Sequence, residues 1–387
     1  MTTDTTLDMD ASIQRILNLR SLLEKKSHFL FGPRQTGKTH LIRESLGDVR
    51  LYDLLDSSIF AALSQNPGRI GEEIRGRAAT VIVDEVQRLP ALLHEVHRLI
   101  ETRSFRFLLT GSSPRKLRRG GVNLLGGRAR TKYFHPFSWR ELSDRYDLAR
   151  AARHGLLPPI YLSDEPKADL QAYTGSYLQE EIVAEGATRN VPAFSRFLHV
   201  AAQANGTVVN FTNMSNDAQV PRTTVYEYFE ILKDTLIVHE LPAWKLSKKR
   251  KPLVSSKYYF FDVGVVGALQ GREFTPGTTE FGGAFETLIM HELVCFRDYG
   301  GGDPITFWRS DSGFEVDFII GDHTAVEAKS KRNVGDSDLR SLRALAEEKK
   351  FKRYMCASLE SRRRTVGDIV ILPYAEFFEE LWAGKYR

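Results

Sequence analysis

Short apolar runs separated by polar turns dominate the first third of the chain, and they predict the strands of a sheet. The predicted strands lie at residues 29–31, 51–56, 80–83, 107–109 and 131–134. Most of these runs lack the alternation of apolar and polar residues that marks a strand with one wet face, so both faces are expected to be buried. After the first run, Leu41, Ile42 and Leu46 have helical spacing. These elements predict an α/β domain with a parallel sheet.

The pattern changes in the middle of the chain, where helices are expected. Residues 141–190 are charged and mostly helical, with a break at 155–159, and predict a lid or linker. A helix at 194–206, a short helix, a turn and a longer amphipathic helix then precede the β-rich residues 235–241. Three helices and a strand in this order suggest a winged helix-turn-helix.

The longer amphipathic helix stands where a DNA-reading helix would stand, but its charge is mixed. It carries Arg222 together with Glu227 and Glu230. A helix that enters the major groove is expected to be richer in Arg, Lys, Asn and Gln on its outer face. We therefore favour a packing or oligomerisation role for this module over direct contact with DNA.

Near the C-terminus, residues 314–320 and 324–330 predict an antiparallel hairpin. A three-residue turn at 321–323 pairs Phe318 with Val326 and makes one face wholly apolar, so burial should select that register. The same register places Asp317 directly opposite Glu327, with Cβ atoms roughly 4.5–5.5 Å apart. Opposed carboxylates need a cation between them.

Two cations could balance this carboxylate pair. Lys329 shares the face of Glu327, and a divalent metal bound by Asp317 and Glu327 would suit their hard oxygen atoms. Such a site could activate a water molecule and stabilise charge on a phosphodiester during its cleavage.

Composition bounds the class of protein. The chain has 387 residues, of which 42% are hydrophobic and 27% charged, as in a globular protein of two or three domains. No apolar run approaches the length of about 18–20 residues that a membrane span needs. The acidic, polar start does not resemble a signal peptide, and two cysteines fit a reduced compartment, so a cytoplasmic location is expected. The net charge of +5 mildly favours a polyanionic partner.

The first loop carries the strongest chemical signal. The spacing Gly32, Gly37, Lys38 and Thr39 matches the phosphate-binding pattern GxxxxGK[ST], between a predicted strand and a predicted helix. The candidate ATP-binding residues are Gly32, Pro33, Arg34, Gln35, Thr36, Gly37, Lys38, Thr39 and His40. Lys38 would reach the β- and γ-phosphates, and Thr39 would offer its hydroxyl to Mg²⁺.

A partner motif ends the strand at 80–83. Asp84 would hold Mg²⁺ through water, and Glu85 would orient the attacking water. At the end of the next strand, Thr110, Ser112 and Ser113 could sense the γ-phosphate. Both predictions follow from the rule that ligands bind at the carboxyl ends of parallel strands.

Over about residues 20–150, this series resembles the AAA-type P-loop ATPases, and most of all a bacterial and archaeal group with the motifs GPRQTGKT, DEVQ, LTGSS and PFSWREL. The resemblance implies that Thr110 belongs to sensor 1. It also implies a conserved role for Arg128, which could reach nucleotide in the same subunit or across an interface. An ordinary loop arginine is equally compatible. The competing arginines are Arg34, Arg115, Arg118 and Arg130. Such ATPases usually form rings, so a homo-oligomer is expected by analogy.

Over about residues 255–387, the chain resembles the PD-(D/E)xK, or restriction-endonuclease-like, nuclease core and the domain of unknown function fused to this ATPase group. Asp317, Glu327 and Lys329 carry the motif, and Val316 replaces the proline. The resemblance implies a further catalytic glutamate on a preceding helix, which Glu286 provides. The neighbouring His291 is expected to be a packing residue.

The densest basic segment follows the middle module. Lys245, Lys248, Lys249, Arg250 and Lys251 lie between Trp244 and Tyr258. This segment could bind a nucleic-acid backbone, or it could be a solvated linker.

The sequence thus predicts an AAA-type P-loop ATPase domain at 1–150, a helical linker and winged-helix domain at 151–250, and a nuclease-like α/β domain at 251–387. The preferred hypothesis is a Mg²⁺-dependent ATPase that acts on nucleic acid, with DNA favoured, through a metal-dependent nuclease centre at Glu286, Asp317, Glu327 and Lys329. The alternative is a nucleotide-driven switch whose C-terminal domain is an inactive platform for protein or DNA.

Overall fold

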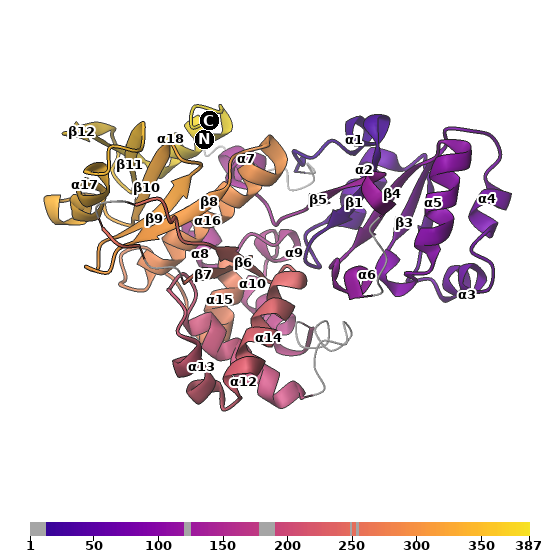
Figure 1. Cartoon of the computed structure of the whole chain (residues 1–387), viewed down its shortest axis with the longest axis horizontal. Coiled ribbons are helices and arrows are strands. Elements are labelled where there is room, and N and C mark those ends of the chain that lie inside the picture. The colour runs from indigo at the N-terminus through magenta and orange to yellow at the C-terminus, as the bar shows by residue number, and fades with distance from the viewer. Residues whose placement is uncertain (1–12, 120–124, 178–189, 248–249, 253–254) are drawn as a thin grey trace, which may run out of the picture.

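A computed structural model describes residues 13–119, 125–177, 190–247, 250–252 and 255–387. The described parts form an N-terminal lobe around one sheet, a C-terminal lobe around another, and a helical lobe beside both (Figure 1).

The N-terminal sheet is parallel and has the order β2-β3-β4-β1-β5. Its strands are β1 (Ser27–Phe31), β2 (Arg50–Asp53), β3 (Thr80–Asp84), β4 (Arg106–Gly111) and β5 (Ala129–Tyr133). Its helices are α1 (Leu19–Lys25), α2 (Lys38–Leu46), α3 (Ser57–Gln65), α4 (Arg69–Glu73), α5 (Leu92–Arg103) and α6 (Arg115–Arg119). All five predicted strands are confirmed. Every residue of β1 is buried, as its unbroken apolar run predicts.

The strand order places β1 between β4 and β5, so the connections that leave β1 and β4 run to opposite sides of the sheet. This is a topological switch point, and the crevice outside the carboxyl ends of the strands is where such sheets bind ligands. The predicted phosphate-binding loop follows β1 at that edge.

After β5 comes α7 (Trp139–Leu142), which packs against the C-terminal lobe through Trp139 and Phe378. The helical lobe then begins with α8 (Leu148–His154), α9 (Pro158–Tyr161) and α10 (Pro166–Ala172). The three expected helices follow as α12 (Val191–Gln203), α13 (Phe211–Ala218) and α14 (Arg222–Asp234). The expected strand is β6 (Val238–Leu241), which pairs antiparallel with β7 (Lys257–Phe260). Helix α15 (Val263–Gln270) comes next. The helices and the strand are as predicted, and the winged-helix assignment stays a prediction.

The C-terminal sheet is mixed and has the order β12-β13-β11-β10-β9-β8. Its strands are β8 (Ile305–Arg309), β9 (Glu315–Ile320), β10 (Thr324–Lys329), β11 (Arg353–Ser358), β12 (Arg364–Val366) and β13 (Ile369–Pro373). The long helix α16 (Phe281–Gly300) precedes it, α17 (Arg340–Ala346) connects β10 to β11, and α18 (Tyr374–Trp382) ends the lobe.

The register of the hairpin β9–β10 is the one that burial of an apolar face predicts. Phe318 pairs with Val326, and Ile320 pairs with Thr324. The ladder of paired residues ends there, and the backbone N–H of Ala328 donates instead to the Asp317 carboxylate at 2.8 Å. The carboxylate thus takes the place of a ladder partner, which fixes Asp317 beside the end of β10.

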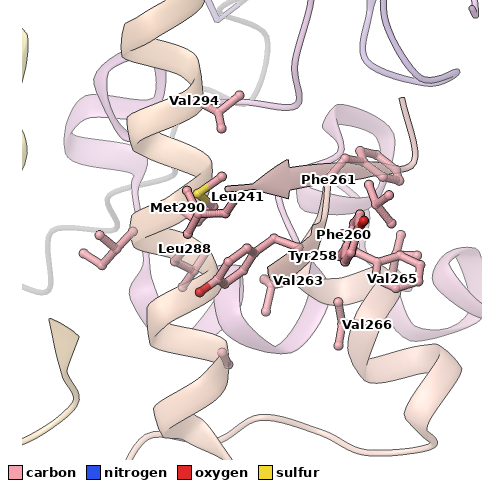
Figure 2. Close-up of a cluster of buried hydrophobic side chains, with 14 of the residues drawn as sticks. Leu241, Tyr258, Phe260, Phe261, Val263, Val265, Val266, Leu288, Met290 and Val294 are labelled. Carbon is pink, nitrogen blue, oxygen red and sulfur yellow. The ribbon is translucent and has the colours of Figure 1, made fainter. Parts of the chain in front are cut away.

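One hydrophobic core joins the helical lobe to the C-terminal lobe. Figure 2 shows Leu288, Met290 and Val294 on α16 beside residues of β7 and α15. These side chains belong to a single buried cluster that runs from Phe137 to Tyr386. Burial at about 25 cal/mol per Å² makes such a shared core the main force that holds the two lobes together.

Helices α8 and α15 meet through a glycine. A methyl group at Gly264 would lie 2.3 Å from the carbonyl oxygen of His154, closer than two such atoms can approach. The neighbouring Asp262 caps α15 by accepting from the N–H of Val265 at 3.1 Å, and it also accepts from the N–H of Leu156 at 2.6 Å. This helix contact therefore requires a residue without a side chain at position 264.

We expect Gly264→Ala to lower the free energy of unfolding by about 1–3 kcal/mol, because the added methyl group forces α8 and α15 apart. The measurement is thermal or urea unfolding followed by circular dichroism. Gly283→Ala is the matched control, since a methyl group there meets nothing within 4 Å on α16. The control should be neutral or stabilising by up to about 1 kcal/mol. Equal destabilisation by both substitutions would contradict the packing argument.

Candidate functional site

The loop between β1 and α2 has the backbone geometry of an anion-binding turn. Gly37 has φ +90° and Gln35 has φ +62°, so the loop contains two left-handed residues before the first turn of α2. A methyl group at Gly32 would lie 2.2 Å from the carbonyl oxygen of Phe134, just beyond β5. Gly32 and Gly37 are thus needed for different reasons, a close approach and a left-handed conformation.

Lys38 lies inside this loop. Its side chain is buried, and its ammonium group donates to the carbonyl oxygens of Gly32 at 2.6 Å and Pro33 at 2.9 Å. The positive charge therefore lies at the amino end of α2, where the helix dipole also favours an anion. This is the position that the sequence predicts for the lysine that binds phosphate.

Asp84 connects the loop to the neighbouring strands. Its Oδ2 atom lies 3.4 Å from the Thr39 hydroxyl, and its Oδ1 atom accepts from the Thr110 hydroxyl. The parallel register explains the second contact, because Val83 pairs with Leu109 and so places the next residues side by side. A carboxylate and a hydroxyl in contact are oxygen donors of the kind that Mg²⁺ prefers, and they fit the predicted Mg²⁺ site.

Glu85 follows Asp84 in a left-handed conformation, with φ +57°. This is uncommon for a residue other than glycine and is typical of functional sites. Burial raises the pKa of its carboxyl, and the charges of Lys38 and Arg34 oppose that shift. A partly buried carboxylate with a raised pKa close to the phosphate loop is suited to accept a proton from water.

Gln87 is a site residue that was not predicted, although it lies within the DEVQ motif. Its amide nitrogen donates to the Glu85 carboxylate and, at 3.3 Å, to the Ser112 hydroxyl. A methyl group at Gly111 would lie 2.2 Å from the Gln87 amide oxygen, so the amide fits closely against β4. Gln87 therefore holds Glu85 in place.

Arg15 is a second such residue, and it lies far from any motif in the sequence. Its guanidinium donates to the carbonyl oxygens of Thr36 at 2.7 Å and His135 at 2.7 Å, and to the Glu141 carboxylate at 2.9 Å. It also stacks over the Phe134 ring at 4.0 Å. Arg15 thus ties the phosphate loop to the segment after β5, and no local pattern could have revealed it.

The acidic centre of the C-terminal lobe brings together Glu286 of α16, Asp317 of β9, and Glu327 and Lys329 of β10, as predicted. Lys329 donates to Glu327 Oε1 at 2.5 Å, and Glu327 Oε2 is buried without a hydrogen-bond partner. Burial raises the pKa of Asp317 to about 7, Glu286 adds to the shift, and Lys257 and Lys329 oppose it. Burial and Asp317 also raise the pKa of Glu327 well above its ordinary value.

Two further side chains belong to this centre and were not predicted. Lys257, at the start of β7, lies 3.2 Å from Glu286 Oε1 and 2.6 Å from Glu315 Oε1. The Tyr259 hydroxyl donates to the same Glu286 oxygen. Burial alone would lower the pKa of Lys257, but Glu286, Asp317 and Glu315 raise it above its ordinary value.

The carboxylates of this centre do not fit the predicted metal ion as they stand. Among the residues that the structure describes, no three His, Cys, Asp or Glu side chains are grouped so that they could hold a metal. Lys257 and Tyr259 donate hydrogen bonds to the Glu286 carboxylate, and Lys329 donates to the Glu327 carboxylate. The buried, unpartnered Glu327 Oε2 is the one feature that favours a bound ligand.

Family models match three consecutive parts of the chain. Residues 24–143 match a model described as an AAA domain. Residues 145–275 and 281–377 match two domains of unknown function, DUF8612 and DUF4143. This AAA model covers the five strands of the N-terminal sheet, and the N-terminal lobe is called the AAA domain below. No curated protein matches the chain.

Among solved structures, the chain is similar to the Orc1 protein of Aeropyrum pernix, solved in complex with DNA. The identity is 15%, and the match covers 68% of this chain and 93% of that chain. The TM-score is 0.25, so nothing is inferred from this likeness.

The structure separates the arginines that compete for a role at the nucleotide. Arg128 precedes Ala129, which pairs with Ser27 at the start of β1, whereas the phosphate loop follows the end of β1. At about 3.3 Å per residue, roughly 13 Å of strand separate them. Arg128 instead pairs with Glu101 on α5. Arg128 therefore lies near the amino ends of the strands, away from the phosphate loop of its own AAA domain, and its role at a nucleotide stays a prediction.

The other candidates lie in different places. Arg34 is part of the loop itself, and Arg130 lies on β5 beside His28. Arg115 is buried and pairs with Asp234 at the end of α14 at 2.8 Å, so it joins the AAA domain to the helical lobe. The Arg118 side chain lies outside the described residues. His40 lies on α2, exposed, 3.9 Å from Glu44.

The aromatic residues that flank the basic segment after β6 are buried. Trp244 is buried and donates to Asp322 at 2.9 Å, and Tyr258 is buried in the shared core. Arg250 pairs with Glu347 at 2.9 Å, and Lys251 lies 3.9 Å from Asp311. Trp244 and Tyr258 are therefore not accessible to a nucleic acid in this conformation, and binding of a nucleic-acid backbone by the basic segment stays a prediction. Lys248 and Lys249 lie outside the described residues.

Two further predictions concern His291 and membrane-spanning helices. His291 is buried, with its ring nitrogen Nε2 2.9 Å from the Phe137 carbonyl oxygen, which is the contact of a packing residue. In the described ranges, no helix is long and apolar enough to cross a membrane.

Arg15→Gln should weaken ATP binding by about tenfold or more, because the loop loses its tie to His135 and Glu141 (a loss of about 1.4 kcal/mol or more). The measurement is calorimetric titration with a non-hydrolysable ATP analogue. Arg20→Gln, which removes an exposed arginine paired with Asp48, is the matched control and should leave affinity unchanged. Unchanged affinity in Arg15→Gln would show that the loop keeps its shape without this arginine.

Proposed function

We propose that this protein binds and hydrolyses ATP with Mg²⁺ at the phosphate loop, and that ATP turnover drives an action on nucleic acid. The observation that carries the proposal is the convergence of Lys38, Asp84, Glu85 and Thr110 at the carboxyl ends of β1, β3 and β4. These are the groups that P-loop ATPases use for phosphate, Mg²⁺ and water.

Each residue has a distinct task in this proposal. Lys38 binds the β- and γ-phosphates, and Thr39 and Asp84 hold Mg²⁺, which neutralises phosphate charge when bound. Glu85 orients the attacking water and accepts its proton, and Gln87 keeps Glu85 in place through their hydrogen bond. Thr110 orients Asp84 from the neighbouring strand.

The oligomeric state is part of the proposal. Arg128 lies at the sheet edge far from its own phosphate loop and is 38% exposed, so a neighbouring subunit is the one place where it could meet nucleotide. A homo-oligomer in which Arg128 reaches across an interface is therefore proposed. The domain boundaries near residues 150 and 250 are also part of the proposal.

For the C-terminal domain, we propose a nuclease-like fold that acts on nucleic acid, with DNA favoured. The order of elements supports this, since α16 is followed by three antiparallel strands, β8 to β10, then α17 and the parallel strand β11. The clustering of Glu286, Asp317, Glu327 and Lys329 supports it as well. The net charge of +5 is compatible with a polyanionic partner.

A second candidate function is a nucleotide-driven switch without nuclease activity. The observation in its favour is that the carboxylates of the acidic centre are already neutralised by Lys257 and Lys329. In this case the C-terminal domain is a binding platform, and ATP turnover changes its affinity for a partner.

We expect Glu85→Gln to retain ATP binding and to lower the rate of hydrolysis by about a hundredfold or more, because the proton acceptor is lost. Lys38→Ala should lose binding itself. Binding is measured by titration and turnover by phosphate release, with Glu44→Gln on the exposed face of α2 as control. Purified wild-type protein that neither binds nor hydrolyses ATP would disprove the proposed function.

If the acidic centre cleaves nucleic acid, wild-type protein should cut at least one substrate that Asp317→Asn leaves intact. The test uses labelled single- and double-stranded DNA and RNA, with Mg²⁺ or Mn²⁺ and with or without ATP. Asp311→Asn, an exposed aspartate on the same lobe, is the control and should cut as wild type does. If no substrate is cut but ATP changes the affinity for one of them, the switch is the correct function.

A further inference from the structure

Lys257 is among the most deeply buried charged residues that the structure describes, at 1% exposure. Its ammonium group lies between two carboxylates, Glu286 at 3.2 Å and Glu315 at 2.6 Å. The centre of the Phe307 ring lies 5.3 Å from the same ammonium group. An ammonium group buried this deeply is stable only because of these partners. Lys257 is therefore held by the acidic centre, and it neutralises that centre in return.

The carboxylates around Lys257 have few free positions for another cation. Glu286 Oε1 accepts from both Lys257 and Tyr259, Glu315 Oε2 lies 3.3 Å from Arg309, and Glu327 Oε1 accepts from Lys329. Glu327 Oε2 is the buried carboxylate oxygen of the centre that has no partner. A divalent ion needs several oxygen atoms at once, so it has to compete with the lysines for them.

Lys257 does not belong to the sheet that carries the carboxylates. It is the first residue of β7, it pairs with Leu241 of β6, and β6 follows α14 closely in the chain. The Glu286 partner lies on α16, and the Glu315 partner lies on β9. Lys257 thus comes from the helical lobe, whereas the acids and Lys329 come from the C-terminal lobe.

We propose that Lys257 is the resident cation of the acidic centre, and that a divalent metal ion and the Lys257 ammonium group exclude one another at Glu286. This inference rests on the proposed nuclease-like centre. In the conformation seen here the centre is closed by Lys257, and metal binding requires that β7 moves so that the ammonium group leaves the carboxylates. Lys257 is a positioning residue that decides whether a metal can enter.

The test is Mn²⁺ binding, followed by electron paramagnetic resonance without nucleotide. All proteins carry Asp84→Asn, so that the AAA domain holds no ion. Lys257→Met should bind Mn²⁺ at least about tenfold more tightly than the parent, because Glu286 and Glu315 become free to bind it. Lys331→Met, which removes an exposed lysine paired with Asp338, is the control and should bind as the parent does.

A second readout is the melting temperature. Lys257→Met leaves two partly buried carboxylates, Glu286 and Glu315, without their cation, so it should melt at a lower temperature, and Mn²⁺ should restore that temperature without affecting the parent. If Lys257→Met does not fold, the double variant Lys257→Met/Glu315→Gln removes one charge of each sign, and the same two measurements apply to it.

The outcomes separate this inference from the proposed nuclease function. Equal or weaker Mn²⁺ binding by the Lys257 variants overturns the inference, even if wild-type protein cuts nucleic acid. Tighter Mn²⁺ binding by the variants without any cleavage supports the inference, while the nuclease proposal fails.

Discussion

The parallel register of β1, β3 and β4 is the constraint on which the AAA domain depends. It places the end of each strand at one edge, so that Asp84 meets Thr110 on one side and Thr39 on the other. None of these residues is close to another in the sequence. A shift of β3 by one residue would turn Asp84 to the other face of the sheet, because side chains alternate along a strand. The burial of both faces of these strands is what holds the register.

Helix α16 is the element that relates the two candidate sites. Near its C-terminal end, Asp298 lies 2.7 Å from His135, which follows β5 of the AAA domain, and the hydroxyl of Tyr299 accepts from the His135 backbone N–H at 2.8 Å. Nearer its start, it carries Glu286 of the acidic centre. One continuous helix thus joins the contact at His135 to the acidic centre. Arg115 and Asp234 form a second contact between the AAA domain and the helical lobe, from which Lys257 comes.

The sequence predicted what depends on local pattern, and it missed what depends on the fold. The central strands β1, β3 and β4 were predictable because each contains an unbroken apolar run, and the hairpin register was predictable because only one register makes an apolar face. Arg15 and Lys257 were not predictable, since their partners lie more than 100 and almost 60 residues away in the chain, at Glu141 and Glu315. The position of Arg128 required the strand order, which no motif specifies. Trp244 and Tyr258 looked available because their neighbours are basic, whereas packing against Phe351 and Phe229 buries them.

The charge balance of the acidic centre limits what it can do in this conformation. Four carboxylates, those of Glu286, Glu315, Asp317 and Glu327, face the two ammonium groups of Lys257 and Lys329. An excess of buried negative charge is costly, and burial accordingly raises the pKa of Asp317 to about 7 and that of Glu327 well above its ordinary value. Other charge is paired with lysine, which makes the centre a structural network in this conformation. Metal binding at this centre, as proposed above, therefore requires a second arrangement of β7, and the elements beside it that contact the AAA domain are α16 and α14.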